Sequence, residues 1–180
     1  MALREIVGPS GRLEALLDEP APPGTIGADG IVNPGHSSGV RAAVVFAHPH
    51  TEMGGTMHTK VVYQAAKALA RIGCAVLRFN FRGAGTSDGA FSNGPGEMDD
   101  FRAALDFMHA RYPHVPMWAG GMSFGSFVAL TVGVEDPRVS TLIGIALPLS
   151  RYDFEPVARS SKPKFFIQGE RDEICPLKTM

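Results

Sequence analysis

The sequence predicts an α/β fold in which a mostly parallel sheet is flanked by helices. From residue 41 onward, short apolar runs alternate with segments of helical periodicity, which is typical of βαβ units. The run Arg41–Ala47 is almost wholly apolar, as expected of a strand that is buried on both faces of a parallel sheet. A later strand runs into a glycine-rich turn and then into an apolar helix, which is a further sign of this class.

The N-terminal part is expected to add a hairpin to this sheet. Two short apolar runs, 3–7 and 13–17, are separated by the turn sequence Gly8–Gly11. The stretch 20–39 is rich in Pro, Gly and Ser and has no periodicity, so it is expected to form an exposed loop.

The remaining elements follow in alternation, each identified by its apolar spacing and by the turn residues at its ends. The strands are expected at 41–47, 75–81, directly before Gly121, at 141–146 and at 164–168; the helices are expected at 57–72, 96–111 and 126–132.

Composition limits the kinds of partner. The 180 residues suit one domain, and 44% hydrophobic with 19% charged residues is an ordinary globular balance. A net charge of -1 without runs of like charge predicts a small-molecule partner rather than nucleic acid or a membrane. No apolar stretch approaches the ~18 residues that span a bilayer, and the N-terminus lacks a signal-peptide core, so a cytoplasmic location is expected.

The two cysteines, Cys74 and Cys175, are far apart and form neither a metal-type cluster nor a disulfide framework. Cys74 begins an apolar run and is expected to be a small buried hydrophobe. No metal-ligand spacing is present, so neither a metal nor another cofactor is expected.

The segment Gly121–Gly125 matches the pattern G-x-S-x-G and predicts a nucleophile at Ser123. The strand before it must reverse sharply into the helix after it. Gly121 and Gly125 would remove side chains that collide across such a turn. The serine is then presented at a helix N-terminus, where the helix dipole favours a developing negative charge.

Four segments in this order make residues 41–180 resemble the α/β-hydrolase superfamily: His48–His50, Arg82–Ser87, Gly121–Gly125 and Gly169–Asp172. The chain looks most similar to small bacterial esterase-like members with little or no lid, near the dienelactone hydrolase-like group. Dienelactone hydrolases carry cysteine where this chain has Ser123, so the resemblance implies a serine esterase.

The acid of the implied triad is assigned to Asp172. It follows the last expected strand, and in a parallel sheet it would share an edge with Ser123. Glu170 and Glu173 remain alternatives.

The general base is absent from its expected place. The superfamily order is serine, acid, then histidine, but all six histidines precede Ser123. The favoured interpretation is that residues 1–180 form a single domain that lacks about one C-terminal strand and helix. The alternatives are a partner chain that supplies this segment, or an altered site that uses His48 or His50.

The oxyanion hole is expected to combine the backbone N–H groups of Phe124 and of His50, with Thr51 as the neighbour of the second donor. Pro49 has no N–H and cannot donate. The side chains of His48 and His50 are expected to brace their loop.

Two side-chain roles near the expected site are left open. Arg82 either anchors its own loop through Asp88 or Glu97, or binds a substrate carboxylate. An apolar acyl pocket is expected to draw its lining from this group of residues: Met53, Gly54, Gly55, Met57 and Phe91.

These observations predict a serine hydrolase that cleaves a small carboxylic ester or thioester through an acyl-enzyme at Ser123. A serine peptidase and a non-catalytic binding or scaffold protein with the same fold are the alternatives. A homo-oligomer is left open, because the strand at 164–168 would present an unpaired edge.

Overall fold

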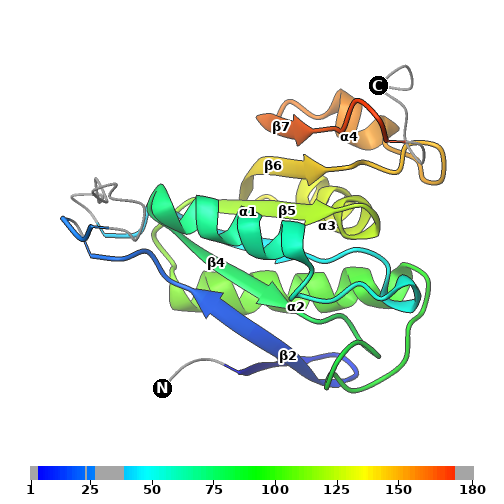
Figure 1. Cartoon of the computed structure of the whole chain (residues 1–180), viewed down its shortest axis with the longest axis horizontal. Helices are drawn as coiled ribbons and strands as arrows, with labels where there is room; N and C mark the ends of the chain where they lie inside the picture. The colour runs from blue at the N-terminus through cyan, green and yellow to red at the C-terminus, as the bar shows by residue number, and fades with distance from the viewer. Residues whose placement is uncertain (1–3, 23, 27–38, 173–180) are drawn as a thin grey trace.

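The computed structural model describes residues 4–22, 24–26 and 39–172, and it confirms the predicted α/β fold (Figure 1). Seven strands form one sheet in the order β1-β2-β4-β3-β5-β6-β7. The strand pairs β1–β2 and β2–β4 are antiparallel, and the remaining neighbours are parallel. In the described ranges, no helix is long and apolar enough to cross a membrane.

The strands are β1 (Glu5–Gly8), β2 (Gly11–Asp18), β3 (Ala42–Ala47), β4 (Cys74–Phe79), β5 (Met117–Met122), β6 (Val139–Ile145) and β7 (Lys164–Ile167). The helices are the 3-10 turn η1 (Thr51–Met53), α1 (Lys60–Arg71), α2 (Pro95–Arg111), α3 (Phe124–Glu135) and α4 (Glu155–Arg159).

The N-terminal hairpin forms as predicted, with Gly8 opposite Gly11 across the turn. Its second strand, β2, pairs with β4 and so joins the hairpin to the main sheet. The described part of the expected loop at 20–39 is exposed except for the half-buried Pro20, whereas Pro23 and residues 27–38 lie outside the described residues.

Strand β3 is buried at all six positions, as the apolar run predicted. Its side chains alternate between two cores because successive residues of a strand point to opposite faces. Ala43, Val45 and Ala47 pack in the larger core, and Ala42, Val44 and Phe46 pack in the smaller one. The Cys74 thiol is buried and free, in agreement with its predicted role.

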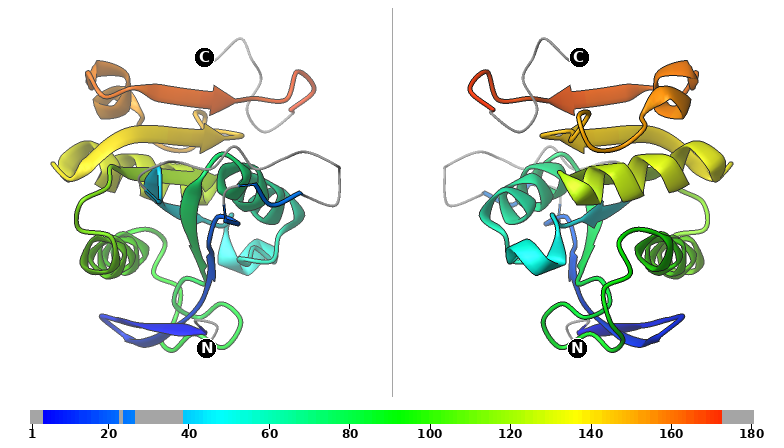
Figure 2. Two further views of the ribbon diagram at one scale, coloured as in Figure 1. Left: turned by 90° about the vertical axis from the view of Figure 1, so that its left-hand side faces the viewer. Right: turned by 90° about the vertical axis from the view of Figure 1, so that its right-hand side faces the viewer.

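Helices cover the two faces of the sheet unequally. Helix α1 contributes Val62 and Ala66 to the smaller core, while α2 and α3 pack on the opposite face (Figure 2). Helix α1 is shorter than the predicted 57–72. Its start is delayed because the Met57 N–H donates to Asn80 Oδ1 (2.7 Å), which holds a turn in place of the first helical residues.

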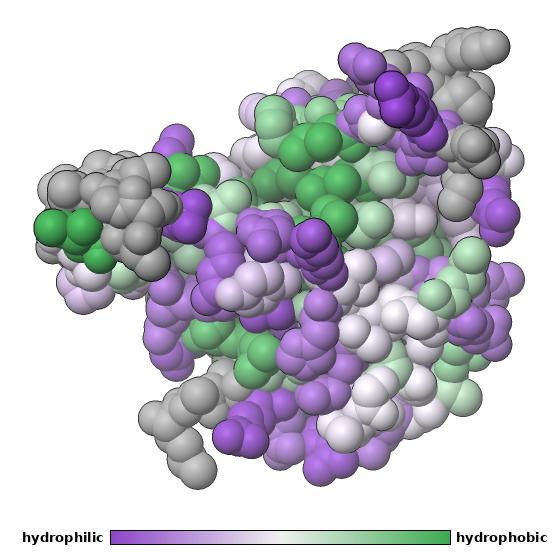
Figure 3. Space-filling view, in the orientation of Figure 1, coloured by the Kyte–Doolittle hydropathy of each residue, from purple (hydrophilic) through white to green (hydrophobic). Residues whose placement is uncertain are grey.

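Strand β7 is the outer strand of the described sheet, and its apolar residues are largely uncovered. Phe165 is 59% exposed and Ile167 is 48% exposed. Both share a face with their β6 partners Ile143 and Ile145, since registered neighbours in a parallel sheet point the same way. Figure 3 shows apolar surface over β6 and β7, beside helix α1.

Candidate active site

Ser123 lies in a strained turn between β5 and α3. Its backbone has φ 53° and ψ -123°, a conformation that non-glycine residues rarely adopt. A Cβ at Gly121 would collide with the carbonyl of Gly125, and a Cβ at Gly125 would collide with the carbonyl of His48. Glycine is therefore required at both positions by backbone contacts, as the sequence pattern predicted.

Hydrogen bonds hold this turn on both sides. The Ser123 N–H donates to the Ile145 carbonyl (2.8 Å), which ties the turn to the end of β6. The Ser123 carbonyl accepts from the backbone N–H (2.8 Å) and the hydroxyl (2.6 Å) of the buried Ser126. Strain of this kind persists only where the surrounding structure over-determines it, which is the situation here.

The two residues expected to supply the oxyanion donors line the same pocket as Ser123. Helix α3 begins at Phe124, so the Phe124 N–H belongs to the first turn, whose donors have no acceptor within the helix. His50 immediately precedes η1, and its carbonyl accepts from Met53 and Gly55 (3.1 and 3.0 Å), which fixes the loop. Phe124, His50 and Ser123 line one pocket.

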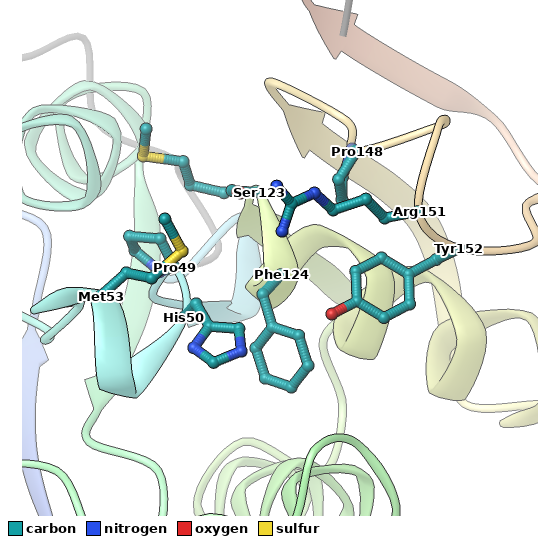
Figure 4. A pocket seen from close by; sticks show the side chains of 9 residues that line it. Pro49, His50, Met53, Ser123, Phe124, Pro148, Arg151 and Tyr152 are labelled. Atoms are coloured by element: carbon teal, nitrogen blue, oxygen red, sulfur yellow. The ribbon is translucent and has the colours of Figure 1, made fainter. Parts of the chain in front are cut away.

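This pocket is a cavity of about 140 Å³, a size that suits a small substrate group (Figure 4). Its lining is mainly apolar: Pro49, His50, Met53, Met122, Ser123, Phe124, Pro148, Arg151 and Tyr152. Of the residues predicted for an acyl pocket, only Met53 is in this lining. Phe91 instead packs against the rings of His50 and Phe124, with centroids 4.4 Å from His50 and 5.5 Å from Phe124.

Pro148, Arg151 and Tyr152 were missed by the sequence reasoning. They follow β6, and the carboxyl ends of parallel strands are where active sites gather. The prediction used the carboxyl ends of β5 and β7 only, although the loop after β6 opens at the same end of the sheet.

His48 is a structural residue in this conformation. Its Nδ1 lies 2.6 Å from the Pro49 carbonyl, and its Nε2 accepts from the Phe81 N–H (3.0 Å). The ring is thus neutral, with its proton on Nδ1. Burial lowers the pKa of His48 to about 4, against a partial opposing effect of the Pro49 carbonyl. Both ring nitrogens are committed, so the alternative of an altered site with His48 as base is wrong for this arrangement.

His50 sits in an aromatic cluster rather than beside an acid. Its ring contacts Phe91 and Phe124, at 4.4 and 5.2 Å between centroids. Its buried Nδ1 has no hydrogen-bond partner among the described residues. Among residues 4–22, 24–26 and 39–172, none forms a hydrogen bond with the Ser123 hydroxyl.

Asp172 follows β7, which runs parallel to β5 and β6, so its loop leaves the sheet at the same end as the turn of Ser123. Its Oδ2 accepts from Gln168 Nε2 (2.9 Å), and Gln168 Oε1 accepts from the Leu147 N–H (3.0 Å). A relay of side chains thus ties the acid to the loop after β6. Asp172 is not among the residues that line the cavity. Glu170 is exposed, and Glu173 and Cys175 lie outside the described residues.

Arg82 is anchored, but by a different residue from the two that were expected. Its Nε and Nη2 donate to the two carboxylate oxygens of the fully buried Asp100 (3.0 and 2.7 Å). Asp88 accepts from the backbone of β2, and Glu97 caps the start of α2. The guanidinium of Arg82 is therefore committed to the fold and not to a substrate carboxylate.

The described residues include no group of three or more His, Cys, Asp or Glu side chains that could hold a metal ion. The features that the structure brings together are the strained Ser123 turn at the start of α3 and a mainly apolar pocket beside it. This combination of fold and turn defines an α/β-hydrolase of the serine type.

The comparisons with known proteins identify the family. A family model described as serine aminopeptidase, S33, matches residues 38–161, and the chain belongs to this family within the α/β-hydrolase superfamily. Among curated proteins, the chain is 40% identical over 131 residues to an uncharacterized protein of Rickettsia prowazekii. This match covers 71% of the chain but 55% of the relative, so the chain matches little more than half of that protein's length.

Two solved structures are similar over almost the whole chain. One is an α/β serine hydrolase without a lid from Xanthomonas campestris, with a TM-score of 0.83 and 36% identity. The other is an α/β serine hydrolase homologue from Coxiella burnetii, with a TM-score of 0.81 and 32% identity. Each match covers 99% of this chain, and 75% and 79% of the respective neighbour.

Proposed function

We propose that this protein is a serine hydrolase that cleaves a small carboxylic ester or thioester through an acyl-enzyme at Ser123. The observation that carries the proposal is the strained Ser123 backbone, with φ 53°, at the start of α3 and in the lining of a cavity. A turn that costs about 1–3 kcal/mol of strain has no structural purpose here that a glycine would not serve better.

The reaction follows from this geometry. Ser123 Oγ attacks the substrate carbonyl carbon while its proton passes to a base, and the carbonyl oxygen becomes an oxyanion. The N–H groups of Phe124 and His50, together with the dipole of α3, stabilise that charge. The C–O or C–S bond then breaks, and the leaving group takes the proton. A water molecule then attacks the acyl carbon while its proton passes to the base. The bond between the acyl carbon and Ser123 Oγ breaks, Oγ takes that proton back, and the carboxylic acid leaves.

In this proposal Asp172 orients the base, and neither His48 nor His50 is that base. His48 is committed through both nitrogens, and the ring of His50 packs between Phe91 and Phe124. Asp172 is the acid in this proposal because it lies at the same sheet edge as Ser123 and is oriented by Gln168. A carboxylate in this role fixes the tautomer of the base and stabilises its protonated form.

The name of the family favours a second candidate, an aminopeptidase. Such an enzyme must bind the α-ammonium group of its substrate, and a carboxylate is the usual partner for an ammonium. No Asp or Glu is found among the described residues that line the pocket, and the charged residue there is Arg151. The electrostatics of the cavity therefore favour an ester or thioester over a peptide with a free N-terminus.

The test combines active-site labelling with turnover. Exposure to a fluorophosphonate should give one adduct by intact mass, and the adduct should disappear in Ser123→Ala but persist in the exposed control Ser161→Ala. Hydrolysis of 4-nitrophenyl butanoate should fall by at least about 10³-fold in Ser123→Ala, because removal of a nucleophile removes most of the catalysis. A folded wild-type protein that takes no adduct and shows no turnover would instead indicate a scaffold protein.

A further inference from the structure

The pocket beside Ser123 carries one formal charge, and it is positive. Among the described lining residues, Arg151 is the member that is always ionised, and none is Asp or Glu. Figure 4 shows its side chain extending across the pocket with the guanidinium directed toward Ser123. A cation in a mainly apolar cavity is stabilised when an anion binds beside it, so the source of that anion has to be identified.

Seven other arginines of the described residues are neutralised by ion pairs within the protein, whereas Arg151 is not. Each of the seven forms an ion pair with Asp or Glu at 3.7 Å or less: Arg12, Arg78, Arg82, Arg102, Arg111, Arg138 and Arg159. Within the described ranges, the Arg151 guanidinium has no ion pair and no hydrogen bond.

The carboxylates of Asp153, Glu155 and Asp172 have other partners. Asp153 Oδ1 accepts from the Glu155 N–H (2.8 Å), and Glu155 pairs with Arg159 (2.7 Å). Asp172 accepts from Gln168. No described neighbour therefore neutralises Arg151 at the pocket.

The backbone that carries Arg151 is well held, so the charge stays near the cavity. The N–H groups of Arg151 and Tyr152 both donate to the Pro148 carbonyl (3.0 and 3.3 Å). The Tyr152 ring stacks on Phe127 with centroids 4.2 Å apart and an interplanar angle of 16°. Burial raises the pKa of the Tyr152 hydroxyl, and the charge of Arg151 partly opposes this rise.

We propose that Arg151 binds a carboxylate on the substrate, so that the enzyme prefers esters or thioesters in which the acyl or the alcohol part carries this anion. The inference rests on the proposed function, since it names the substrate class of the Ser123 site. A guanidinium matches a carboxylate through two parallel hydrogen bonds, and it does so at low cost where no internal partner must be displaced. The same charge repels an α-ammonium group, which agrees with the choice of an esterase over an aminopeptidase.

The first test measures kcat/KM for two pairs of esters that differ only in charge, after subtraction of spontaneous hydrolysis. The acyl pair is mono-4-nitrophenyl glutarate against 4-nitrophenyl pentanoate. The alcohol pair is 4-carboxyphenyl butanoate against 4-carbamoylphenyl butanoate. The anionic member of at least one pair should be preferred about tenfold to hundredfold, the range for a hydrogen bond to a charged group.

Variants then assign the preference to Arg151. Arg151→Gln should lower kcat/KM for the anionic ester about tenfold more than for its neutral partner, and Arg151→Lys should retain part of the preference. The matched control is Arg171→Gln, an exposed arginine that does not line the pocket and should leave both values unchanged. Equal rates within both pairs, or a preference that survives in Arg151→Gln, would overturn the proposal.

A binding measurement separates this inference from the proposed function. Calorimetric titration of monomethyl glutarate into Ser123→Ala should show binding that is lost in Ser123→Ala/Arg151→Gln. If no ester is hydrolysed but this difference is found, the anion site stands and the hydrolase proposal fails. If neutral esters are hydrolysed in a Ser123-dependent manner and neither the preference nor the binding difference is found, the anion site fails and the hydrolase stands.

Discussion

The middle of the sheet and its β7 edge hold the two parts of the proposed site in very different surroundings. Strands β3 and β5 deliver the loop of His48 and the turn of Ser123, and β3 is buried at every position. Strand β7 delivers Asp172, yet three of its four residues are exposed. Ser123, the proposed nucleophile, is thus positioned by dense packing, whereas Asp172, the proposed acid, follows a strand with one described neighbour.

The difference shows how the constraint on each group arises. Around Ser123, the carbonyls of Gly125 and His48 leave no space for a side chain at either glycine of the turn. Around Asp172, the carboxylate is oriented by the hydrogen bond from Gln168, and a Cβ added at Gly169 would meet its nearest atom at 3.8 Å. Changes in the middle of the sheet are therefore expected to cost far more than matched changes at β7.

The largest difference in stability is expected between two phenylalanine-to-alanine variants, one in the middle of the sheet and one in β7. Phe46→Ala should lower the free energy of unfolding by about 3–5 kcal/mol, because a fully buried ring leaves a cavity in the smaller core. Phe165→Ala should cost less than about 1 kcal/mol, because the ring is 59% exposed. Urea denaturation measures both. Equal losses of unfolding free energy would mean that the β7 face is covered in solution, and the two regions would then not differ in packing.

A smaller difference in stability is expected between two glycine-to-alanine variants, one in the Ser123 turn and one after β7. Gly125→Ala should lower the free energy of unfolding by about 1–3 kcal/mol, because the new Cβ meets the backbone carbonyl of His48. The same variant should lose fluorophosphonate labelling as the turn shifts. Gly169→Ala meets no close atom and should cost nothing or stabilise by up to about 1 kcal/mol. Retained labelling in Gly125→Ala would show that the turn tolerates more than its geometry implies.

The smallest effect is a pH dependence that comes from the middle of the sheet. The folded pKa of His48 is about 4 and its ordinary value is 6.5, so the unfolded chain binds more protons between these limits. Stability is therefore complete above about pH 6.5 and is lost as pH falls toward 4. At pH 5.5 the loss relative to pH 8 should be about 1.4 kcal/mol.

The matched variants isolate this contribution from that of the carboxylates. His48→Gln should flatten the pH dependence of unfolding between pH 5 and 7, while the exposed His58→Gln should preserve it. Carboxylates whose pKa is lowered, such as Asp18, lose their contribution only at lower pH and cancel in the comparison. An unchanged slope in His48→Gln would contradict the assignment of a neutral, buried ring.

Local patterns allowed much of this protein to be predicted. The apolar run at 41–47 became the buried strand β3, and the Gly121–Gly125 spacing became a strained turn with Ser123 at its centre. Both features depend on residues that are neighbours along the chain, so their spacing carries the information. The exact start of α1 could not be predicted, because it depends on the side chain of Asn80, which comes from a different segment.

The residues that line the pocket and the partners in the ion pairs could not be predicted, because they depend on which segments the fold brings together. Asp88, Glu97 and Asp100 are all close to Arg82 in sequence. Asp88 accepts from β2 and the buried Glu97 caps α2, so the equally buried Asp100 pairs with Arg82. Arg151 has no sequence signature, and it reaches Ser123 because β6 lies beside β5 in the sheet. Spacing along the chain encodes secondary structure and tight turns, whereas charge partners and pocket walls are set by distances between segments that exist once the layers have packed.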